Sequence, residues 1–375
     1  MTHPTIFWTE SGRKRSARWR SESRKFPPEK VIIADDTMKA DTAFRLACGG
    51  TAILWRGDFQ NAKQLLNAMA RRADRKSKKT CKAPSSMAEA FHRHRMAISN
   101  RTRILGMLLL ELDADHSIYL RRAPDTRKLI AEAHGFDGRP GVIALRELLG
   151  IIGAHEWRKK GIEIDFLKDR IYPHYGVFSP VRKEYIALVA KTPVPSHTLA
   201  FDIGTGTGVL AAVLAKKGVS KVIATDIDLR AIDCARENIM RLGFADRVEV
   251  MAADLFPPQK APLIVCNPPW IPAKPVTPLE KAIYDFESRF LYRFLNKLPR
   301  HLEPGGEAWL LLSDLAEHLE LRPRKQLLSA FKKAGLEVLE KIDTRPTHPR
   351  SQDKNDPLHT ARAAEITSLW RLGAI

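Results

Sequence analysis

The tetrapeptide Asn267-Pro268-Pro269-Trp270 directly follows Leu263–Cys266, an apolar run typical of a buried strand. Two consecutive prolines restrict the backbone, so we expect the Asn267 side chain and the Pro268 carbonyl to face a cleft at the end of the strand. Their oxygens can accept both hydrogens of an NH2 group, and the Trp270 indole offers a flat face to a planar group. The alternative interpretation is a proline-rich turn with a buried tryptophan.

A glycine-rich turn, Phe201-Asp202-Ile203-Gly204-Thr205-Gly206-Thr207-Gly208, lies between a predicted strand and a predicted helix. Glycines let the backbone approach a ligand closely, and the amides at a helix N-terminus favour negatively charged groups. Taken alone, the turn fits a dinucleotide-binding site or a purely structural role equally well.

Two acidic residues each end one of the following strands. Asp226 ends the run Val222–Thr225, where a carboxylate can accept hydrogen bonds from both hydroxyls of a ribose. Asp254 and Leu255 end the next strand, where a carboxylate could accept from an adenine amine beside an apolar neighbour. Each acid, considered singly, could equally be a helix cap.

In this order and spacing, Asp202–Gly208, Asp226, Asp254 and the NPPW tetrapeptide resemble the motifs of class I S-adenosylmethionine-dependent methyltransferases, in the branch that methylates nitrogen in planar groups. The resemblance covers residues 170–375. It implies that the glycine turn surrounds the amino-acid part of S-adenosylmethionine, that Asp226 holds the ribose and that Asp254 holds the adenine amine. The implied cofactor residues are Asp202, Gly204, Thr205, Gly206, Gly208, Asp226, Ile227, Asp254, Leu255 and Asn267. The resemblance also implies catalytic roles for Asn267, Pro268 and Trp270.

Within that branch, Gly176–Arg182 takes the place of the segment that covers the active site in the release-factor glutamine methyltransferases (HemK-like), which also have a helical N-terminal domain. The resemblance implies substrate contacts for Phe178, Pro180, Asn267 and Trp270. Related RNA-base methyltransferases carry a similar Gly-Val-Phe-Ser segment, so this feature does not identify the substrate.

The sequence departs from the release-factor pattern at two positions. The tetrapeptide ends in Trp270, where that family has tyrosine. The covering segment continues as Arg182-Lys183-Glu184, where that family has an acidic pair.

Short apolar runs separated by helical patterns predict the elements that position these motifs. The expected fold class is α/β, with a seven-stranded, mostly parallel Rossmann-like sheet preceded by a basic helical domain. Strands are expected at 198–203, 221–226, 248–252, 262–266 and 307–312, followed by an antiparallel edge near 336–343 and 365–371.

Four parts are predicted along the chain. Residues 1–30 form a basic, disordered tail, and residues 31–160 form a basic helical domain for substrate or RNA recognition, with helices expected at about 87–112, 124–133 and 141–157. Residues 161–196 connect the domains and cover the active site, and residues 197–375 form the methyltransferase domain.

Positive charge is concentrated towards the N-terminus. The chain has 62 Lys and Arg against 43 Asp and Glu, a net charge of +19, and residues 1–110 account for +14 of it. Such asymmetry indicates a polyanionic partner for the front of the molecule. The densest stretch, Arg71–Arg103 around an expected loop at 76–85, is interpreted as a solvated face or as an RNA or ribosome footprint. His92 and His94 are assigned to that basic surface, and no metal is expected.

The remaining composition fits an ordinary globular protein. The longest strongly apolar run, Ile104–Leu112, is far shorter than the roughly 20 residues of a membrane span. Four cysteines without CxxC spacing favour a reducing, cytoplasmic environment. Cys234 and Cys266 are interpreted as core residues, and His348 and His359 as part of a solvated loop between the last two strands.

These observations favour an N-methyltransferase of the translation apparatus that acts on the side-chain amide of a protein glutamine. The alternative is a methyltransferase for an exocyclic amine of adenine or guanine in RNA. A third hypothesis is an inactive protein that binds S-adenosylmethionine and RNA. A dinucleotide-dependent oxidoreductase would leave Asn267–Trp270 without a role.

Overall fold

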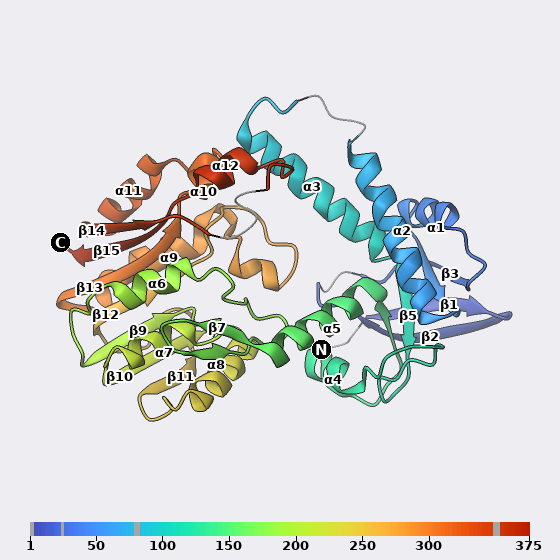
Figure 1. Cartoon of the computed structure of the whole chain (residues 1–375), viewed down its shortest axis with the longest axis horizontal. Coiled ribbons are helices and arrows are strands. Elements are labelled where there is room, and N and C mark those ends of the chain that lie inside the picture. The colour runs from blue at the N-terminus through green and yellow to red at the C-terminus, as the bar shows by residue number, and fades with distance from the viewer. Residues whose placement is uncertain (1–3, 24–25, 79–82, 348–352) are drawn as a thin grey trace. The chain divides into compact units, whose positions relative to one another are not determined.

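The computed structural model describes residues 4–23, 26–78, 83–347 and 353–375. The chain divides into two compact units (Figure 1). The first consists of Met1–Ser85 and His92–Glu156, and the second of Ser86–Phe91 and Trp157–Ile375. Each unit is built around a β-sheet of its own.

The first unit contains a six-stranded mixed sheet in the order β1-β2-β6-β5-β4-β3. Its strands are β1 (Thr5–Glu10), β2 (Arg13–Arg20), β3 (Lys30–Ala34), β4 (Thr51–Trp55), β5 (Leu108–Leu112) and β6 (Gly141–Ala144). The helices that follow these strands are α1 (Ala40–Cys48), α2 (Phe59–Lys78), α3 (Met87–Leu105), α4 (Arg127–His134) and α5 (Leu145–Lys160). The chain passes between the units three times: just before α3, within α3 and within α5.

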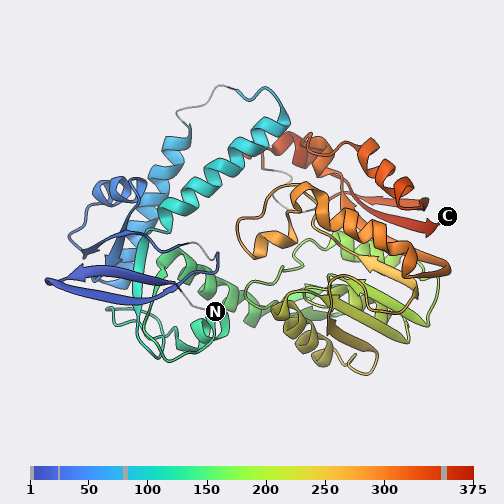
Figure 2. The same cartoon turned by 180° about the vertical axis from the view of Figure 1, so that it is seen from behind.

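The predicted disordered tail at residues 1–30 is wrong, because β1 and β2 form an antiparallel hairpin. Figure 2 shows it as a long two-stranded ribbon, in dark blue. Ile6 and Trp8 of β1 and Ala17 and Trp19 of β2 are buried in the core of this unit. In β1 the buried residues alternate with the exposed residues Thr5, Phe7 and Thr9, which is the period of a half-buried strand. The dense positive charge hid this alternation in the sequence.

The predicted helical domain at residues 31–160 is also wrong. Three short apolar runs, at β4, β5 and β6, are buried strands and not helix segments. Periodicity cannot separate a short buried strand from a piece of buried helix, which explains the error. The helix expected at about 87–112 ends at Leu105, and the one expected at 141–157 begins only at Leu145. Of the loop expected at 76–85, residues 79–82 lie outside the described chain, and α2 reaches Lys78.

The six strands curl so that β1, at one end of the strand order, also contacts β3 at the other end. Arg56, at the end of β4, links the two ends: its guanidinium donates to both carboxylate oxygens of Glu10, at 2.8 and 2.7 Å. The same guanidinium lies 2.6 Å from Glu111 of β5. The hydrogen bonds from Arg56 hold the pKa of Glu10 at about 2.

The second unit confirms the α/β expectation for residues 197–375. Its seven-stranded sheet has the order β11-β10-β9-β12-β13-β15-β14, and only β15 runs antiparallel to its neighbours. The strands are β9 (Leu199–Ile203), β10 (Lys221–Asp226), β11 (Val248–Ala252), β12 (Ala261–Cys266), β13 (Leu302–Ser313), β14 (Leu336–Thr344) and β15 (Thr367–Ala374). All seven predicted strands are therefore present, including the antiparallel edge.

Alternate residues of these strands enter separate cores on the two faces of the sheet. In β9, Ala200 packs in the core that contains α6, α7 and α8, and Phe201 packs in the core that contains α9 and α11. The helices of this unit are α6 (Glu184–Lys191), α7 (Val209–Lys216), α8 (Leu229–Arg241), α9 (Arg289–Lys297), α10 (Leu315–His318), α11 (Arg324–Lys333) and α12 (His359–Ala364). A two-stranded ribbon of β7 (Ile162–Ile164) and β8 (Asp169–Ile171) precedes them.

Among the described residues, no helix combines the length and the apolar character that a membrane crossing requires.

Candidate active site

The candidate motifs of the second unit lie at one edge of its sheet. The glycine turn follows β9, Asp226 ends β10, Asp254 follows β11 and Asn267 follows β12. These four strands are parallel neighbours, so their carboxyl ends meet at this edge. Ligands of open α/β sheets bind at such an edge.

The glycine turn is a left-handed backbone held against β10. Gly204, Gly206 and Gly208 have φ values of 73°, 56° and 80°, a region that favours glycine. The backbone N–H groups of Gly204 and Thr205 both donate to the Thr225 carbonyl at 2.9 Å. The turn is therefore fixed before any ligand binds.

Asp202, at the end of β9, is buried with 1% of its surface exposed. One carboxylate oxygen accepts hydrogen bonds from the Thr205 hydroxyl at 2.6 Å and from the Ala211 backbone N–H at 3.0 Å. Burial raises the pKa of Asp202 to about 6, although both hydrogen bonds act in the opposite direction. Asp202 thus ties the glycine turn to the first turns of α7.

Asp226 joins the glycine turn to the start of α8. Its two carboxylate oxygens accept from the backbone N–H groups of Gly206 and Asp228, each at 3.0 Å. Burial raises the pKa of Asp226, and these hydrogen bonds oppose the rise. Each oxygen keeps a further lone pair for a ligand hydroxyl. Ile227, next in the chain, is exposed beside this carboxylate.

Asp254 has a partner that the sequence did not indicate. Arg293 of α9 donates to its carboxylate at 2.5 Å, and both side chains are about half exposed. Leu255 has a left-handed φ of 79°, and its carbonyl accepts from the Thr225 hydroxyl at 2.6 Å. The loop after β11 is therefore anchored to β10, while Asp254 lies in an ion pair at the surface.

The NPPW tetrapeptide forms an ordered cluster after β12. The Trp270 indole Nε1–H donates to Asn267 Oδ1 at 2.9 Å and to the Leu311 carbonyl of β13 at 3.1 Å. An indole N–H can only donate, so it selects the oxygen of the Asn267 carboxamide. That oxygen retains a second lone pair, and Asn267 itself is only partly buried. Pro268 is buried in the same turn.

The backbone beyond Trp270 is held by buried polar residues that the sequence analysis missed. Arg322, only 3% exposed, donates to the Ser288 hydroxyl at 3.1 Å and to the Trp270 carbonyl at 3.4 Å. Asp285 accepts from the backbone N–H groups at the start of α9, and its own N–H donates to the Ile271 carbonyl at 2.9 Å. Burial raises the pKa of Asp285.

The segment before α6 contacts the tetrapeptide through Arg182, and its predicted role in covering the active site stays a prediction. Arg182 lies with its guanidinium carbon 4.8 Å from the centroid of the Trp270 ring. Pro180 is buried, and Phe178 is half-buried. No hydrogen bond or ring contact on the described chain ties Phe178 to Asn267 or Trp270, so its predicted substrate contact stays a prediction.

Asn238 of α8, which the sequence analysis did not single out, connects Tyr172, before the covering segment, to the glycine turn. Its Oδ1 accepts from the Tyr172 N–H at 2.8 Å, and its Nδ2 donates to the Tyr172 and Thr207 carbonyls, each at 3.2 Å. The side chain is fully buried. An asparagine on the apolar face of an amphipathic helix was the available signal, since a buried amide requires partners.

The other residues singled out in the sequence have no place in this site. Cys234 and Cys266 are buried core residues, as expected, and burial raises the pKa of Cys234 to about 12. His92 and His94 lie on α3, and no described group of three or more His, Cys, Asp or Glu side chains could hold a metal ion. His359 begins α12, and His348 lies outside the described residues.

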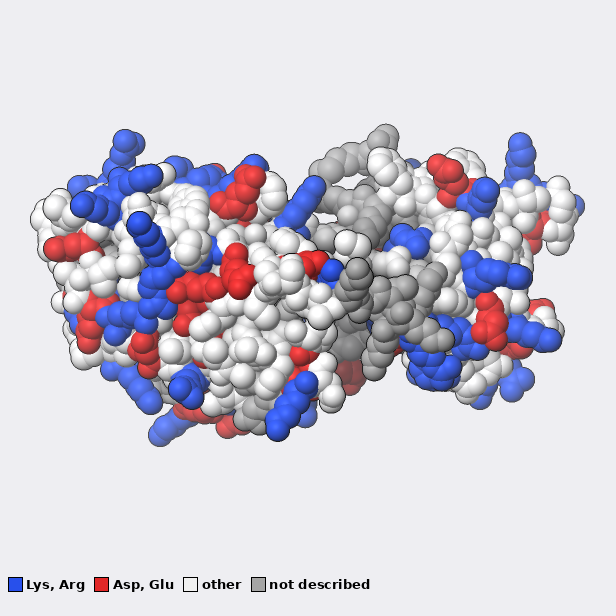
Figure 3. Space-filling model, turned by 90° about the horizontal axis from the view of Figure 1, so that it is seen from above, with Lys and Arg blue, Asp and Glu red and all other residues white. Residues whose placement is uncertain are grey.

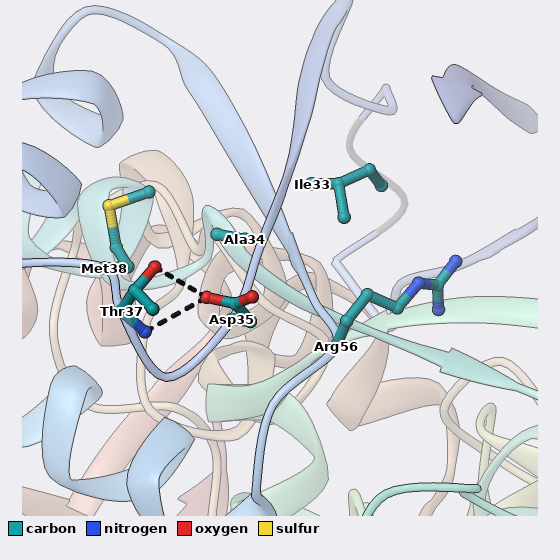
Figure 4. A pocket seen from close by; sticks show the side chains of 6 residues that line it. All are labelled: Ile33, Ala34, Asp35, Thr37, Met38 and Arg56. Atoms are coloured by element: carbon teal, nitrogen blue, oxygen red, sulfur yellow. Dashed lines mark hydrogen bonds between the residues drawn. The ribbon is translucent and has the colours of Figure 1, made fainter. Parts of the chain in front are cut away.

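A hollow of about 270 Å³ lies in the first unit, at the carboxyl end of β3 (Figure 4). Its polar side chains already have partners: Asp35 accepts from the Thr37 hydroxyl and N–H, and Arg56 binds Glu10 and Glu111. The hollow belongs to a different unit from the methyltransferase motifs.

Residues 170–336 match the family described as the methyltransferase small domain. The second unit carries a methyltransferase small domain. The match extends from β8 to the start of β14, so it includes the glycine turn, both strand-end acids and the NPPW tetrapeptide. The resemblance drawn from these motifs is therefore confirmed.

Curated relatives of this domain modify either a protein or a tRNA, according to their names. A release factor glutamine methyltransferase of Rhodopirellula baltica is 34% identical over 137 residues, which is 32% of this chain and 46% of the relative. A Methanocaldococcus jannaschii protein named as an N5-glutamine methyltransferase is 28% identical over 47% of this chain and 88% of its own length. A tRNA1(Val) (adenine(37)-N6)-methyltransferase of Vibrio parahaemolyticus is 39% identical over 24% of this chain and 40% of the relative. The chain thus spans about half or less of the first and third of these relatives.

Proposed function

We propose that the protein transfers a methyl group from S-adenosylmethionine to an exocyclic amine of adenine or guanine in RNA. The observation that carries this proposal is the ordered Asn267–Trp270 pair, whose free acceptor lone pair and indole ring suit a planar base with an NH2 group. It is supported by the tRNA adenine methyltransferase among the relatives.

The residues of the domain fit S-adenosylmethionine. A Cβ on Gly206 would meet nothing within 4 Å, so the turn is open on that side, where an amino-acid group can lie against the backbone. Asp226 keeps acceptor capacity for two ribose hydroxyls. Asp254 can accept from the adenine amine with the oxygen that does not bind Arg293. When bound, the cofactor supplies a methyl group that its sulfonium already activates.

The chain's own residues orient the acceptor nitrogen. Its two N–H groups donate to Asn267 Oδ1 and to the Pro268 carbonyl, which raises electron density on a conjugated, weakly nucleophilic nitrogen. Trp270 keeps the plane of the acceptor aligned and excludes water on one side. A strong general base is not required, because the proton can leave once the nitrogen carries positive charge.

The methylation of a glutamine amide, which the sequence favoured, is the second candidate. The names of two relatives support it, and an amide NH2 could use the same two acceptors. The first unit argues against it, because one of the three features behind that preference, a helical N-terminal domain, is a six-stranded α/β unit. The NPPW tetrapeptide and the segment before α6, the other two features, are compatible with both candidates.

The first unit is proposed to contact RNA or the ribosome, since residues 1–110 contain most of the net positive charge. Phe7 of β1 is 67% exposed on the outer face of the hairpin, opposite Ser16, with Lys14 on the same face. Exposed aromatic rings between cations are typical of surfaces on which single-stranded bases stack. A cytoplasmic location is proposed with this partner.

The basic stretch on α2 and α3 is partly neutralised. Arg72 pairs with Asp41, and Arg101 pairs with Asp74. In the view of Figure 3, groups of Lys and Arg side chains are separated by acidic and uncharged surface. On the side seen in this view, the positive charge available for the proposed contact with RNA is dispersed.

The test is transfer of radiolabelled methyl groups into a cell lysate, followed by separate digestion with ribonuclease and with protease. Label released by ribonuclease and retained after protease is the expected result. Label released only by protease would favour the glutamine candidate. Cofactor binding without any label would favour the inactive, binding-only hypothesis.

A further inference from the structure

The two departures from the release-factor pattern, Arg182 and Trp270, contact each other in the folded domain. The guanidinium carbon of Arg182 lies 4.8 Å from the Trp270 ring centroid, within the ~6 Å range of cation–π attraction. The contact joins the segment before α6 to the NPPW tetrapeptide, so the two motifs form a single feature of this domain.

Arg182 is itself held rigidly. Its Nε–H donates to Glu184 at 2.6 Å, one terminal nitrogen donates to Glu365 at 2.9 Å, and the other donates to the Thr367 hydroxyl at 3.3 Å. Both glutamate side chains are buried, and Glu365 also accepts from the Ser313 hydroxyl at 2.5 Å. The planar guanidinium has partners for all three nitrogens, so its orientation over the ring is determined.

The fixed orientation of the Trp270 ring also restricts the rest of the tetrapeptide. Trp270 donates its indole N–H to Asn267 Oδ1 and to the Leu311 carbonyl, so the plane of the ring determines where the carboxamide oxygen points. We propose that Arg182 is a positioning residue, which fixes the plane of Trp270 and thereby aims the Asn267 oxygen at the acceptor nitrogen. This inference rests on the proposed methyl transfer.

A positioning role predicts an effect on the chemical step and not on binding. Preorganised acceptors assist the reaction because they need no rearrangement as charge develops. Loss of the cation over the ring should therefore lower kcat and leave KM and the dissociation constant of S-adenosylmethionine nearly unchanged.

The single substitution Arg182→Met would leave two buried carboxylates without a counter-charge, which threatens the fold. The test therefore uses the triple variant Arg182→Met, Glu184→Gln, Glu365→Gln, which removes the cation and both anions together at similar side-chain volume.

A matched control exists on the same sheet. Arg371 of β15 also lies between two glutamates, at 2.6 Å from Glu307 and 2.5 Å from Glu340, away from the edge that carries the site. The control variant is Arg371→Met, Glu307→Gln, Glu340→Gln. It should reproduce any general effect of removing a charged triad and leave kcat within about twofold.

The expected result is a kcat about tenfold lower in the Arg182 triple variant, with KM and cofactor affinity within about twofold of the parent. The same triple change, made in a Trp270→Phe background, should lower kcat by less than about twofold, because Arg182 acts through the indole. An equal loss in both backgrounds, or an unchanged kcat, would overturn the inference.

A second measurement does not depend on activity. The indole N–H signal of Trp270, identified by its absence in the Trp270→Phe variant, should exchange slowly with solvent in the parent. In the Arg182 triple variant this N–H signal should change its chemical shift and exchange faster with solvent. In the Arg371 control variant it should not change. An unaffected signal would refute the role of Arg182 even if the parent methylates RNA. A changed signal in a protein that methylates nothing would support the contact and refute the proposed function.

Discussion

Replacing Asp202 by Asn should stabilise the methyltransferase domain at neutral pH while weakening cofactor binding. The Asp202 carboxyl is buried, and burial raises its pKa from 3.8 to about 6. Both of its hydrogen bonds, from Thr205 and Ala211, reach the same oxygen. An asparagine oxygen in that place can accept both, so the substitution removes the charge and keeps the hydrogen bonds.

The pH dependence follows from the direction of the pKa shift. A pKa about 2 units above the unfolded value corresponds to about 3 kcal/mol. Because the folded pKa of Asp202 is raised, its protonated form favours the folded state. The contribution of protonated Asp202 to the free energy of unfolding is fully present below about pH 4. It is lost as the pH rises through about 6. The stability gained by Asp202→Asn should therefore be about 1 kcal/mol near pH 4.5 and approach about 3 kcal/mol above pH 7.

The measurement is urea unfolding of the full chain between pH 4.5 and 8, followed by circular dichroism. The two units can unfold in separate transitions, so the transition that S-adenosylmethionine shifts is assigned to the second unit. An Asp246→Asn variant, at an exposed position, controls for a general loss of negative charge and should change the unfolding free energy by less than about 0.5 kcal/mol.

Cofactor binding provides the opposite readout. The affinity for S-adenosylmethionine should fall roughly tenfold in Asp202→Asn, because a charged acceptor contributes more than a neutral one. A stability difference that does not vary with pH would refute the assignment of a raised pKa. If Asp202→Asn gains stability in a pH-dependent way but keeps its affinity for S-adenosylmethionine, the raised pKa is supported. Only the predicted contact of Asp202 with the cofactor would then be refuted.

Three further outcomes are expected. Asn267→Ala should lower turnover by about 100-fold and leave the cofactor dissociation constant, measured by equilibrium dialysis, within about twofold; equal loss of both would argue against its role towards the acceptor. Gly208→Ala should destabilise the second unit by about 2 kcal/mol in thermal unfolding, since its φ is 80° and a Cβ would lie 3.2 Å from Ala235; an unchanged melting temperature would contradict this. Arg56→Met should destabilise the first unit by about 1 kcal/mol at pH 7, because it leaves Glu10 and Glu111 without their shared partner; the loss should disappear in a Glu10→Gln, Glu111→Gln background.

In the second unit, local sequence patterns were sufficient to predict the architecture. Strands β9, β10 and β12 are short apolar runs, and β9 and β10 are each followed directly by a helix. Since parallel neighbouring strands end at one edge, the order of the motifs already placed Asp226 and Asn267 beside the glycine turn. These positions depend on chain order and local periodicity, which a sequence displays directly.

The first unit was not predictable in the same way. The alternation of buried Ile6 and Trp8 with exposed residues extends over one short strand only. The charges of β2 gave residues 1–30 the composition of a disordered tail. The runs at β4 and β5 are too short to distinguish a strand from a helix. Whether these runs form strands or helices is decided by their pairing with strands far away in the sequence.

The tertiary structure alone decided which side chains meet at the candidate site. Arg182 and Trp270 each looked like an isolated exception to a family pattern, yet the fold brings them into contact. Arg293 reaches Asp254, and Asn238 joins the glycine turn to the covering segment, through the packing of α9 and α8 against the sheet. Such contacts depend on the angles and distances between packed elements, and no periodicity within one segment encodes them. The sequence by itself therefore determined the chemistry and its place on the sheet, while packing determined the partners that orient it.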